Sequence, residues 1–218
     1  MALASALERL CVQCVERLPV DQAVIHLMID GDVGVAAASD ASAAACGELP
    51  FLTGVGPCFD AIRLRRPVLV PDLAVAGDRW PGYVAAMQEL GVRAVHSCPL
   101  QLGAVGLGVL DLYAGTPGPL PQDDLAAALS LARRATEILL HGEDGGADGA
   151  VAERVDALGD LLDHRSEIFQ AQGAVMVALE VPLGEAMLRL RAHAFATGLP
   201  LVELARMVLA DLSSPESW

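Results

Sequence analysis

The chain has 218 residues, enough for one or two domains whose core needs neither a disulfide nor a metal. Fourteen arginines, no lysine and 28 acidic residues give a net charge of −14, which argues against a basic nucleic-acid wrapper and against a binder of anionic membranes. No stretch reaches the roughly 18 uninterrupted apolar residues of a membrane-spanning helix. The N-terminus also lacks the basic region that begins a secretory signal. We therefore expect a cytoplasmic protein.

The residue types used in catalysis and metal binding are scattered along the chain. Cys11-x-x-Cys14 lies in a helical pattern without a second cysteine pair, which predicts packed thiols rather than a zinc site or a redox motif. The five histidines lack metal-ligand spacing, and no nucleophile stands beside a base. His26 and His96 are expected to be half-buried strand residues. The sequence thus predicts no metal, no cofactor and no enzymatic activity.

One segment separates the chain into two parts. Gly142 to Ala150 contains four glycines and three acids in nine residues, a composition that neither holds a helix nor buries a core. It predicts a linker over residues 142–150 between an N-terminal domain, residues 1–141, and a C-terminal domain, residues 151–218.

The N-terminal part alternates helical and strand patterns. In chain order it predicts a helix, a hairpin turning at an Asp-Gly pair, further helices, a short strand, a second hairpin and a closing helix. This order predicts an antiparallel sheet with flanking helices. The predicted bounds are Leu3–Leu18 for the first helix, Ala23–Ile29, Val33–Ala38, Val68–Val70, Ala94–Leu100 and Val105–Tyr113 for the strands, and Gln122–Leu140 for the last helix.

Three glycines in the second hairpin resemble a phosphate-binding loop. However, Gly106-x-Gly108 lies inside a strand pattern, with no third glycine and no helix after it. Close packing of backbones is therefore the favoured interpretation.

Several motifs in the N-terminal part occur in a familiar order. They are Gly54-Val-Gly-Pro-Cys-Phe-Asp-Ala-Ile-Arg63, Pro67-Val-Leu-Val-Pro-Asp-Leu73, Arg79-Trp-Pro-Gly-Tyr83, Gly91-Val-Arg-Ala-Val95 and Gly108-Val-Leu-Asp-Leu-Tyr113. This run resembles the GAF domains of actinobacterial regulators, which are small-molecule sensor and dimerisation modules built around an antiparallel sheet. The resemblance implies a cavity between the sheet and the loops that cover it, and we place near it Phe51, Cys58, Phe59, Arg93, Val95 and His96. Alternatively, these side chains fill the cavity and the domain is structural.

The C-terminal part has helical periodicity throughout. From residue 155 to residue 179, positions spaced by three and four carry Val, Leu, Leu, Arg, Phe, Gln, Met and Leu, which predicts a coiled-coil-like stripe suited to a homodimer. A second face of this helix packs on two shorter helices, and the small Ala171 and Gly173 let a neighbour approach. A second helix is predicted over Leu183–Thr197, ended by Gly198. Pro200 begins the third helix.

Motifs in these helices carry a second resemblance. The segment from His164 to Met176, together with Pro182-Leu-Gly-Glu-Ala186, Leu190-Arg191 and Leu201-Val-Glu-Leu-Ala205, resembles an ANTAR domain. That family is a three-helix module of transcription antiterminators that binds paired hairpins in nascent messenger RNA as a dimer. The resemblance, centred on residues 165–210, implies as RNA-binding residues Arg165, Gln170, Gln172, Arg189, Arg191 and Arg206.

Charge leaves a second hypothesis open. Residues 151–218 hold five arginines and ten acids, a net charge of −5, whereas RNA affinity usually depends on neutralising phosphates. Gln172 stands where the ANTAR motif commonly has lysine. The first hypothesis is a signal-responsive antiterminator, whose GAF domain senses a small molecule or a signalling partner and whose dimeric ANTAR domain binds RNA. The alternative is a sensor or scaffold whose helical domain only dimerises or docks, with Arg165 and Gln172 fixing helix register.

Overall fold

The computed structural model describes residues 2–29, 32–141 and 166–211. The chain divides into two compact units, one of residues 1–51 and 55–157, the other of residues 158–218 with the short segment 52–54. The predicted linker over residues 142–150 and the predicted seam helix from residue 151 through Arg165 lie outside the described residues. The two units are described one at a time.

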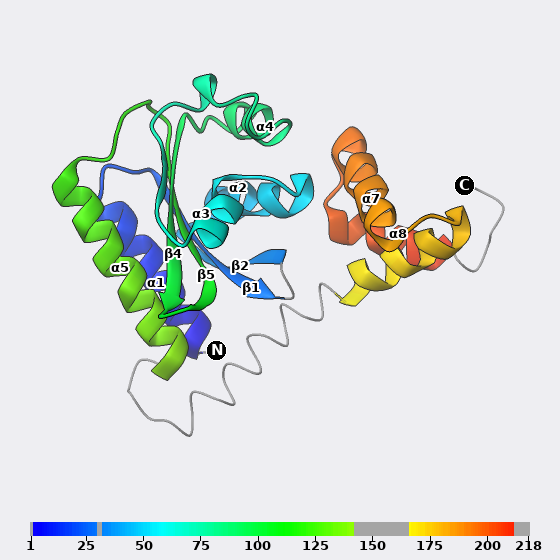
Figure 1. Cartoon of the computed structure of the whole chain (residues 1–218), viewed down its shortest axis with the longest axis horizontal. Coiled ribbons are helices and arrows are strands. Elements are labelled where there is room, and N and C mark those ends of the chain that lie inside the picture. The colour runs from blue at the N-terminus through cyan, green and yellow to red at the C-terminus, as the bar shows by residue number, and fades with distance from the viewer. Residues whose placement is uncertain (1, 30–31, 142–165, 212–218) are drawn as a thin grey trace. The chain divides into compact units, whose positions relative to one another are not determined.

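The first unit is built on a five-stranded antiparallel sheet with the strand order β2-β1-β5-β4-β3 (Figure 1). Two hairpins, β1–β2 and β4–β5, join through the pairing of β1 with β5. The sequence predicted every strand to within a few residues. Their bounds are Gln22–Ile29 for β1, Asp32–Ala38 for β2, Val68–Val70 for β3, Ala94–Leu102 for β4 and Val105–Ala114 for β5.

Helices cover both faces of this sheet. The first and last helices, α1 and α5, lie side by side over one face, and α3 packs on β3, β4 and β5 from the other (Figure 1). The sequence predicted α1 and α5 closely but gave no bounds for the helices between β2 and β4. The observed bounds are Ala2–Arg17 for α1, Ala41–Thr53 for α2, Pro57–Leu64 for α3, Tyr83–Glu89 for α4 and Gln122–His141 for α5, with a short 3-10 turn, η1, over Leu73–Val75.

Local signals fix the helices that periodicity left undefined. The Asp40 carboxylate accepts a hydrogen bond from the Ala43 amide, 2.8 Å away, and so caps the start of α2. Pro57 occupies the first position of α3, where its missing N–H leaves no donor unpaired. Arg65 ends α3 in a left-handed conformation, with φ of 53°.

Strand alternation gives the sheet two separate cores. Val24, Val95 and Tyr113 share one face, and with α2, α3 and α4 they form a buried cluster that we call the α2–α4 core. Ile25 and Leu110, paired across β1 and β5, point the opposite way, under α1 and α5. Which layer a strand residue faces therefore depends on its parity along the strand.

Close backbone packing explains one of the predicted glycines. A Cβ on Gly108 would overlap the backbone carbonyl of His26 on the neighbouring strand β1. Gly106, two residues earlier, has only the Met28 Cε atom at 3.6 Å, an ordinary contact. The structure confirms the packing interpretation for Gly108, while Gly106 has room for a side chain.

The described part of the second unit is a small three-helix arrangement. Its helices span residues 166–179, Leu183–Thr197 (α7) and Leu201–Asp211 (α8), as the sequence predicted for the last two. Gly198 ends α7 at φ of 68°, the left-handed cap that the sequence indicated. The apolar residues that these helices bury are Ile168, Ala171, Val175, Ala186, Met187, Leu190, Ala194, Leu201, Leu204, Ala205 and Val208.

Gly173 differs from its predicted role. A Cβ built on it would meet no atom within 4 Å in the described residues, so packing inside one chain does not require a glycine there. Ala171, by contrast, is fully buried. The close approach that the sequence predicted for both positions holds only for Ala171.

Within the described ranges, no single helix has the length and apolar character needed to cross a membrane. The pair α7 and α8, bent by 112° at the break between them, passes that test by length and composition alone. Both helices bury one side within their unit, as the core helices of a small domain do.

Candidate ligand-binding and RNA-binding sites

A buried polar pair crosses the centre of the sheet. His26 on β1 and Asp111 on β5 are both fully buried, with His26 Nδ1 3.3 Å from the Asp111 carboxylate oxygen Oδ2. The other ring nitrogen, Nε2, lies 2.9 Å from the carbonyl oxygen of Gly47 on α2. Because a carbonyl only accepts, this contact assigns the hydrogen to Nε2. The imidazole thus links the sheet to α2.

Gly47 permits that link. A Cβ at this position would lie 2.8 Å from a Val35 methyl carbon and 2.9 Å from a Val24 methyl carbon. Any side chain would therefore push α2 away from the sheet. The glycine lets the helix backbone come within hydrogen-bonding distance of His26.

Asp111 is a carboxyl group held inside an apolar layer. Burial raises its pKa, and the charge of His26 and the neighbouring hydroxyls of Ser97 and Tyr113 act in the opposite direction. The Tyr113 hydroxyl donates to Asp111 Oδ2 over 3.4 Å. The other carboxyl oxygen, Oδ1, has no hydrogen-bond partner among the described residues.

Tyr83 adds a polar atom without a partner. It lies on α4, its side chain is buried, and its hydroxyl oxygen has no hydrogen-bond partner among the described residues. Burial raises the pKa of this phenol well above its usual value, so it stays neutral. An unpaired buried hydroxyl costs folding free energy, which makes it a candidate contact for a bound molecule.

Three of the six predicted cavity residues belong to the α2–α4 core or pack against it. Cys58 and Val95 are fully buried members of the α2–α4 core, and Phe59 packs against it, half-buried. Cys58 lies near Tyr83, because both approach within 4 Å of a Cβ built on Gly56. All three thus lie on the sheet face that α2, α3 and α4 cover.

The other three lie elsewhere. His96 pairs with Leu112 across β4 and β5, so it points toward the layer of α1 and α5, opposite to Val95. Arg93 precedes β4 and reaches toward Asp72, with 3.9 Å between Nη2 and Oδ1. Phe51 lies on α2 outside the α2–α4 core.

Sequence reasoning missed the most polar part of this site. It treated His26 as an ordinary half-buried strand residue, and it did not single out Asp111 or Tyr83. A signal was present in Asp111, the one charged residue of the apolar run Val105 to Ala114. A carboxylate inside a strand buried on both faces needs partners.

All five cysteines are buried as packed thiols, and none forms a disulfide. Burial raises the pKa of Cys46 to about 11 and that of Cys98 to about 12, so both stay protonated near neutral pH. Within the parts of the chain that the structure describes, no group of three His, Cys, Asp or Glu side chains is placed to hold a metal ion.

In the second unit, two predicted glutamines differ sharply. Gln172 is only 8% exposed, and its amide Nε2 donates to the carbonyl oxygen of Leu183 over 2.9 Å, which ties the helix over residues 166–179 to the start of α7. Gln170, two residues earlier, is exposed. The structure therefore gives Gln172 a role inside its own unit and leaves Gln170 accessible.

Two of the predicted arginines form ion pairs with acidic side chains of the second unit. Arg189 contacts Glu185 one turn earlier on α7, with its Nη2 atom 2.6 Å from Oε1. Arg206 on α8 bridges to Glu167 with 2.8 Å between Nε and Oε2. Arg191 follows two residues after Arg189 on α7. Arg165 lies outside the described residues.

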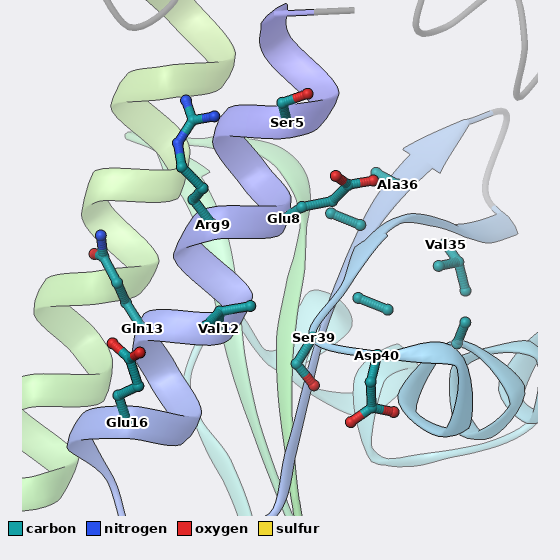
Figure 2. A pocket seen from close by; sticks show the side chains of 13 residues that line it. Ser5, Glu8, Arg9, Val12, Gln13, Glu16, Val35, Ala36, Ser39 and Asp40 are labelled. Atoms are coloured by element: carbon teal, nitrogen blue, oxygen red, sulfur yellow. The ribbon is translucent and has the colours of Figure 1, made fainter.

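The first unit also has two surface hollows. One, of about 860 Å³, lies between α1, the edge strand β2 and the start of α2; Figure 2 shows Glu8 and Val12 on its α1 side, and Ser39 and Asp40 opposite. A second, of about 620 Å³, lies between the end of α1 and α5. The first also includes Val35 and Ala38, which pack against the α2–α4 core, whereas the second is lined only by residues of α1 and α5.

Solved structures share the fold of the first unit. The GAF domain of a phosphoenolpyruvate-protein phosphotransferase from Coxiella burnetii is 19% identical, with a TM-score of 0.53, and covers 66% of this chain and 86% of that one. A type II free methionine-R-sulfoxide reductase from Thermoplasma acidophilum is 17% identical, with a TM-score of 0.50, and covers 62% and 90%. The PixJ GAF domain from Thermosynechococcus elongatus is 18% identical, with a TM-score of 0.50, and covers 62% and 83%. At these identities the likeness shows the fold alone.

Family models identify both units. A GAF-domain model matches residues 1–139 and an ANTAR-domain model matches residues 156–209. The chain belongs to the GAF-domain family and carries a C-terminal ANTAR domain. Both are regulatory domains, and ANTAR domains bind RNA in antiterminators. Among curated proteins, none matches this sequence.

Proposed function

We propose that this protein is a signal-responsive, RNA-binding transcription antiterminator of the cytoplasm. Its GAF unit senses a small molecule or a signalling partner, and its ANTAR unit binds tandem hairpins in nascent messenger RNA as a homodimer. The observation that carries the proposal is the presence of both domain matches in one chain, in sensor-then-effector order. The protein is a regulator rather than an enzyme.

The RNA-binding surface centres on exposed polar side chains of the ANTAR unit. Gln170, Arg189 and Arg206 are exposed, Arg191 is half-buried, and Arg165 is added from the sequence. Arg189 and Arg206 are half-exposed and each has one acidic partner, so phosphates compete with a single carboxylate for each guanidinium. We expect modest affinity directed at loops, where arginine stacks on bases and forms paired hydrogen bonds. Gln172 acts through folding instead.

The sensing site lies over the α2–α4 core. We place Cys58, Phe59 and Val95 in its apolar wall, and the hydroxyl of Tyr83 as the donor that orients a small polar molecule. Such a combination of apolar wall and a few convergent polar groups is typical of ligand sites.

A second function is favoured by a specific observation. The ion pairs of Arg189 and Arg206, together with the net charge of −5 on residues 151–218, suit a docking or dimerisation module that binds no RNA. In that case the helical unit only passes the state of the GAF unit to a partner protein.

The test is a salt series of binding between the full chain and an RNA with two tandem hairpins. Saturable binding that weakens with salt supports the antiterminator. Gln170→Ala and Arg165→Ala should each weaken binding by about 1–3 kcal/mol. Arg66→Ala, which removes one exposed positive charge from the GAF unit, is the control.

Two outcomes would contradict the proposal. The first is an absence of binding at low salt by a folded, dimeric chain both alone and with a GAF ligand. The second is equal loss in the Arg66 control, which would reduce the binding to non-specific charge attraction.

A further inference from the structure

The hollow between α1 and α5 collects positive charge. Its lining includes Arg17 from the last turn of α1, and Arg133 and Arg134 from the middle of α5. One acid, Glu137, lines the same hollow. Three guanidinium groups and one carboxylate give this small region a net charge of +2 in a chain whose net charge is −14.

The positive charge of these three arginines is little neutralised by the acidic residues that the structure describes, so it is available to a ligand. No ion pair joins Arg17 or Arg134 to any of the residues that the structure describes. Arg133 lies 3.8 Å from Glu137, and both side chains are more than half exposed, so their attraction is weak and screened by salt. Elsewhere, by contrast, Asp60 holds two arginines at 2.8 and 2.9 Å.

The shape and chemistry of the hollow define a ligand class. At about 620 Å³ it lies within the range of small-molecule sites. Its floor includes Leu131, which is buried, and Ser130 supplies a hydroxyl. Guanidinium groups present paired N–H donors whose geometry matches phosphate oxygens.

We propose that this hollow binds a small anion carrying two or more negative charges on phosphate oxygens, held by Arg17, Arg133 and Arg134. The site is separate from the α2–α4 core, because it is lined only by residues of α1 and α5, which cover the opposite face of the sheet. An anion bound there bridges the two helices and couples its concentration to their packing. The proposal does not depend on RNA binding by the ANTAR unit.

The experiment is calorimetric titration of the full chain with pyrophosphate at low ionic strength. The informative variants are Arg134→Gln and the double variant Arg17→Gln with Arg134→Gln. The matched control is Arg65→Gln with Arg66→Gln, which removes the same charge from exposed positions at the end of α3. Light scattering of each variant gives its oligomeric state.

The wild type should bind pyrophosphate saturably, and orthophosphate more weakly. Each lost arginine of the hollow should raise Kd about tenfold, the order of a charge-assisted hydrogen bond, with the control unchanged. Absence of saturable binding by the wild type overturns the proposal, and so does an equal loss in the control. A variant that loses affinity only together with its oligomeric state overturns it as well. If the double variant loses RNA affinity while pyrophosphate never binds, the arginines contact RNA and the proposal fails.

Discussion

The GAF unit places polar side chains inside its fold, whereas the ANTAR unit keeps most of them at its surface. His26, Asp111 and Tyr83 are buried between the sheet and its helices. In the ANTAR unit, Arg189 and Arg206 lie at the surface in ion pairs, and Gln172 is the buried exception. A buried polar group depends on fixed partners and costs free energy where it has none, as the Tyr83 hydroxyl does. Exposed ones exchange partners with solvent and ligands at little cost.

The difference teaches where each unit can respond to a signal. If the proposed function holds, a substitution inside the GAF unit changes stability and ligand binding together. A surface substitution in the ANTAR unit then changes RNA binding and leaves the fold intact. Stability and affinity measured side by side therefore separate structural residues from contact residues.

The largest expected effect tests the internal packing of the GAF unit. Gly108→Ala places a Cβ against the backbone carbonyl of His26, which cannot move without breaking the β1–β5 ladder. We expect a loss of about 3 kcal/mol in the free energy of unfolding. Urea unfolding measures it. Gly106→Ala, with the flexible Met28 end as its only neighbour, is the control and should change stability by less than about 1 kcal/mol. Equal losses in both variants would contradict the packing argument.

The second prediction separates the two glutamines of the ANTAR unit. Gln172→Ala removes the donor to the Leu183 carbonyl and should lower the stability of this unit by about 1–2 kcal/mol, because a buried hydrogen bond is lost. Gln170→Ala should leave stability unchanged. Differential scanning calorimetry of the full chain compares them. A larger loss for Gln170 would reverse the roles assigned here.

The third prediction concerns two buried tyrosines. Tyr83→Phe removes a hydroxyl without a partner and should raise the stability of the ligand-free GAF unit by about 1 kcal/mol, whereas Tyr113→Phe removes a donor to Asp111 and should lower it by a similar amount. Thermal unfolding of both variants gives the sign. Stabilisation by Tyr113→Phe would show that the bond to Asp111 contributes nothing.

The fourth prediction uses two glycines of the ANTAR unit. Gly173→Ala should stabilise the helix over residues 166–179 by about 0.5–1 kcal/mol, since the position has space and alanine favours helix. Gly198→Ala should cost about 1 kcal/mol, because φ of 68° is strained for a side chain. Calorimetry again reports both. If the chain proves to be the proposed homodimer and Gly173→Ala dissociates it in light scattering, the glycine lies in the seam between chains.

The smallest effect is a pH dependence in the α1–α5 layer. Burial lowers the pKa of His96 below its ordinary value of 6.5. As the pH falls, His96 is therefore protonated in the unfolded chain before it is protonated in the folded chain. The contribution of neutral His96 to the free energy of unfolding is fully present above pH 6.5 and is lost as the pH decreases toward the pKa that His96 has in the folded state. His96→Gln should flatten the decline of the unfolding free energy over that window. A slope identical to that of the wild type would mean that His96 does not titrate on unfolding.

The regular elements followed from local sequence. Strand alternation and turn residues placed β1 to β5, helical periodicity placed α1, α5, α7 and α8, and Gly198 marked the end of α7. The bounds of α2, α3 and α4 did not follow, because each is short and fixed by caps and by contacts with the sheet. Motifs alone indicated the GAF and ANTAR families, which the family models confirm.

Roles within those elements depended on the tertiary structure. The sequence showed which strand residues share a face. Only the packing of the helices on each face places Val95 in the α2–α4 core with Cys58 and directs His96 toward the layer of α1 and α5. Gln170 and Gln172 are chemically identical and two residues apart, and only the position of Leu183 makes one structural. Arg17 and Arg134 are 117 positions apart in the sequence, and they line the same hollow because α1 and α5 lie side by side. Local sequence determines backbone preference, whereas the pairing of distant side chains depends on how the elements pack.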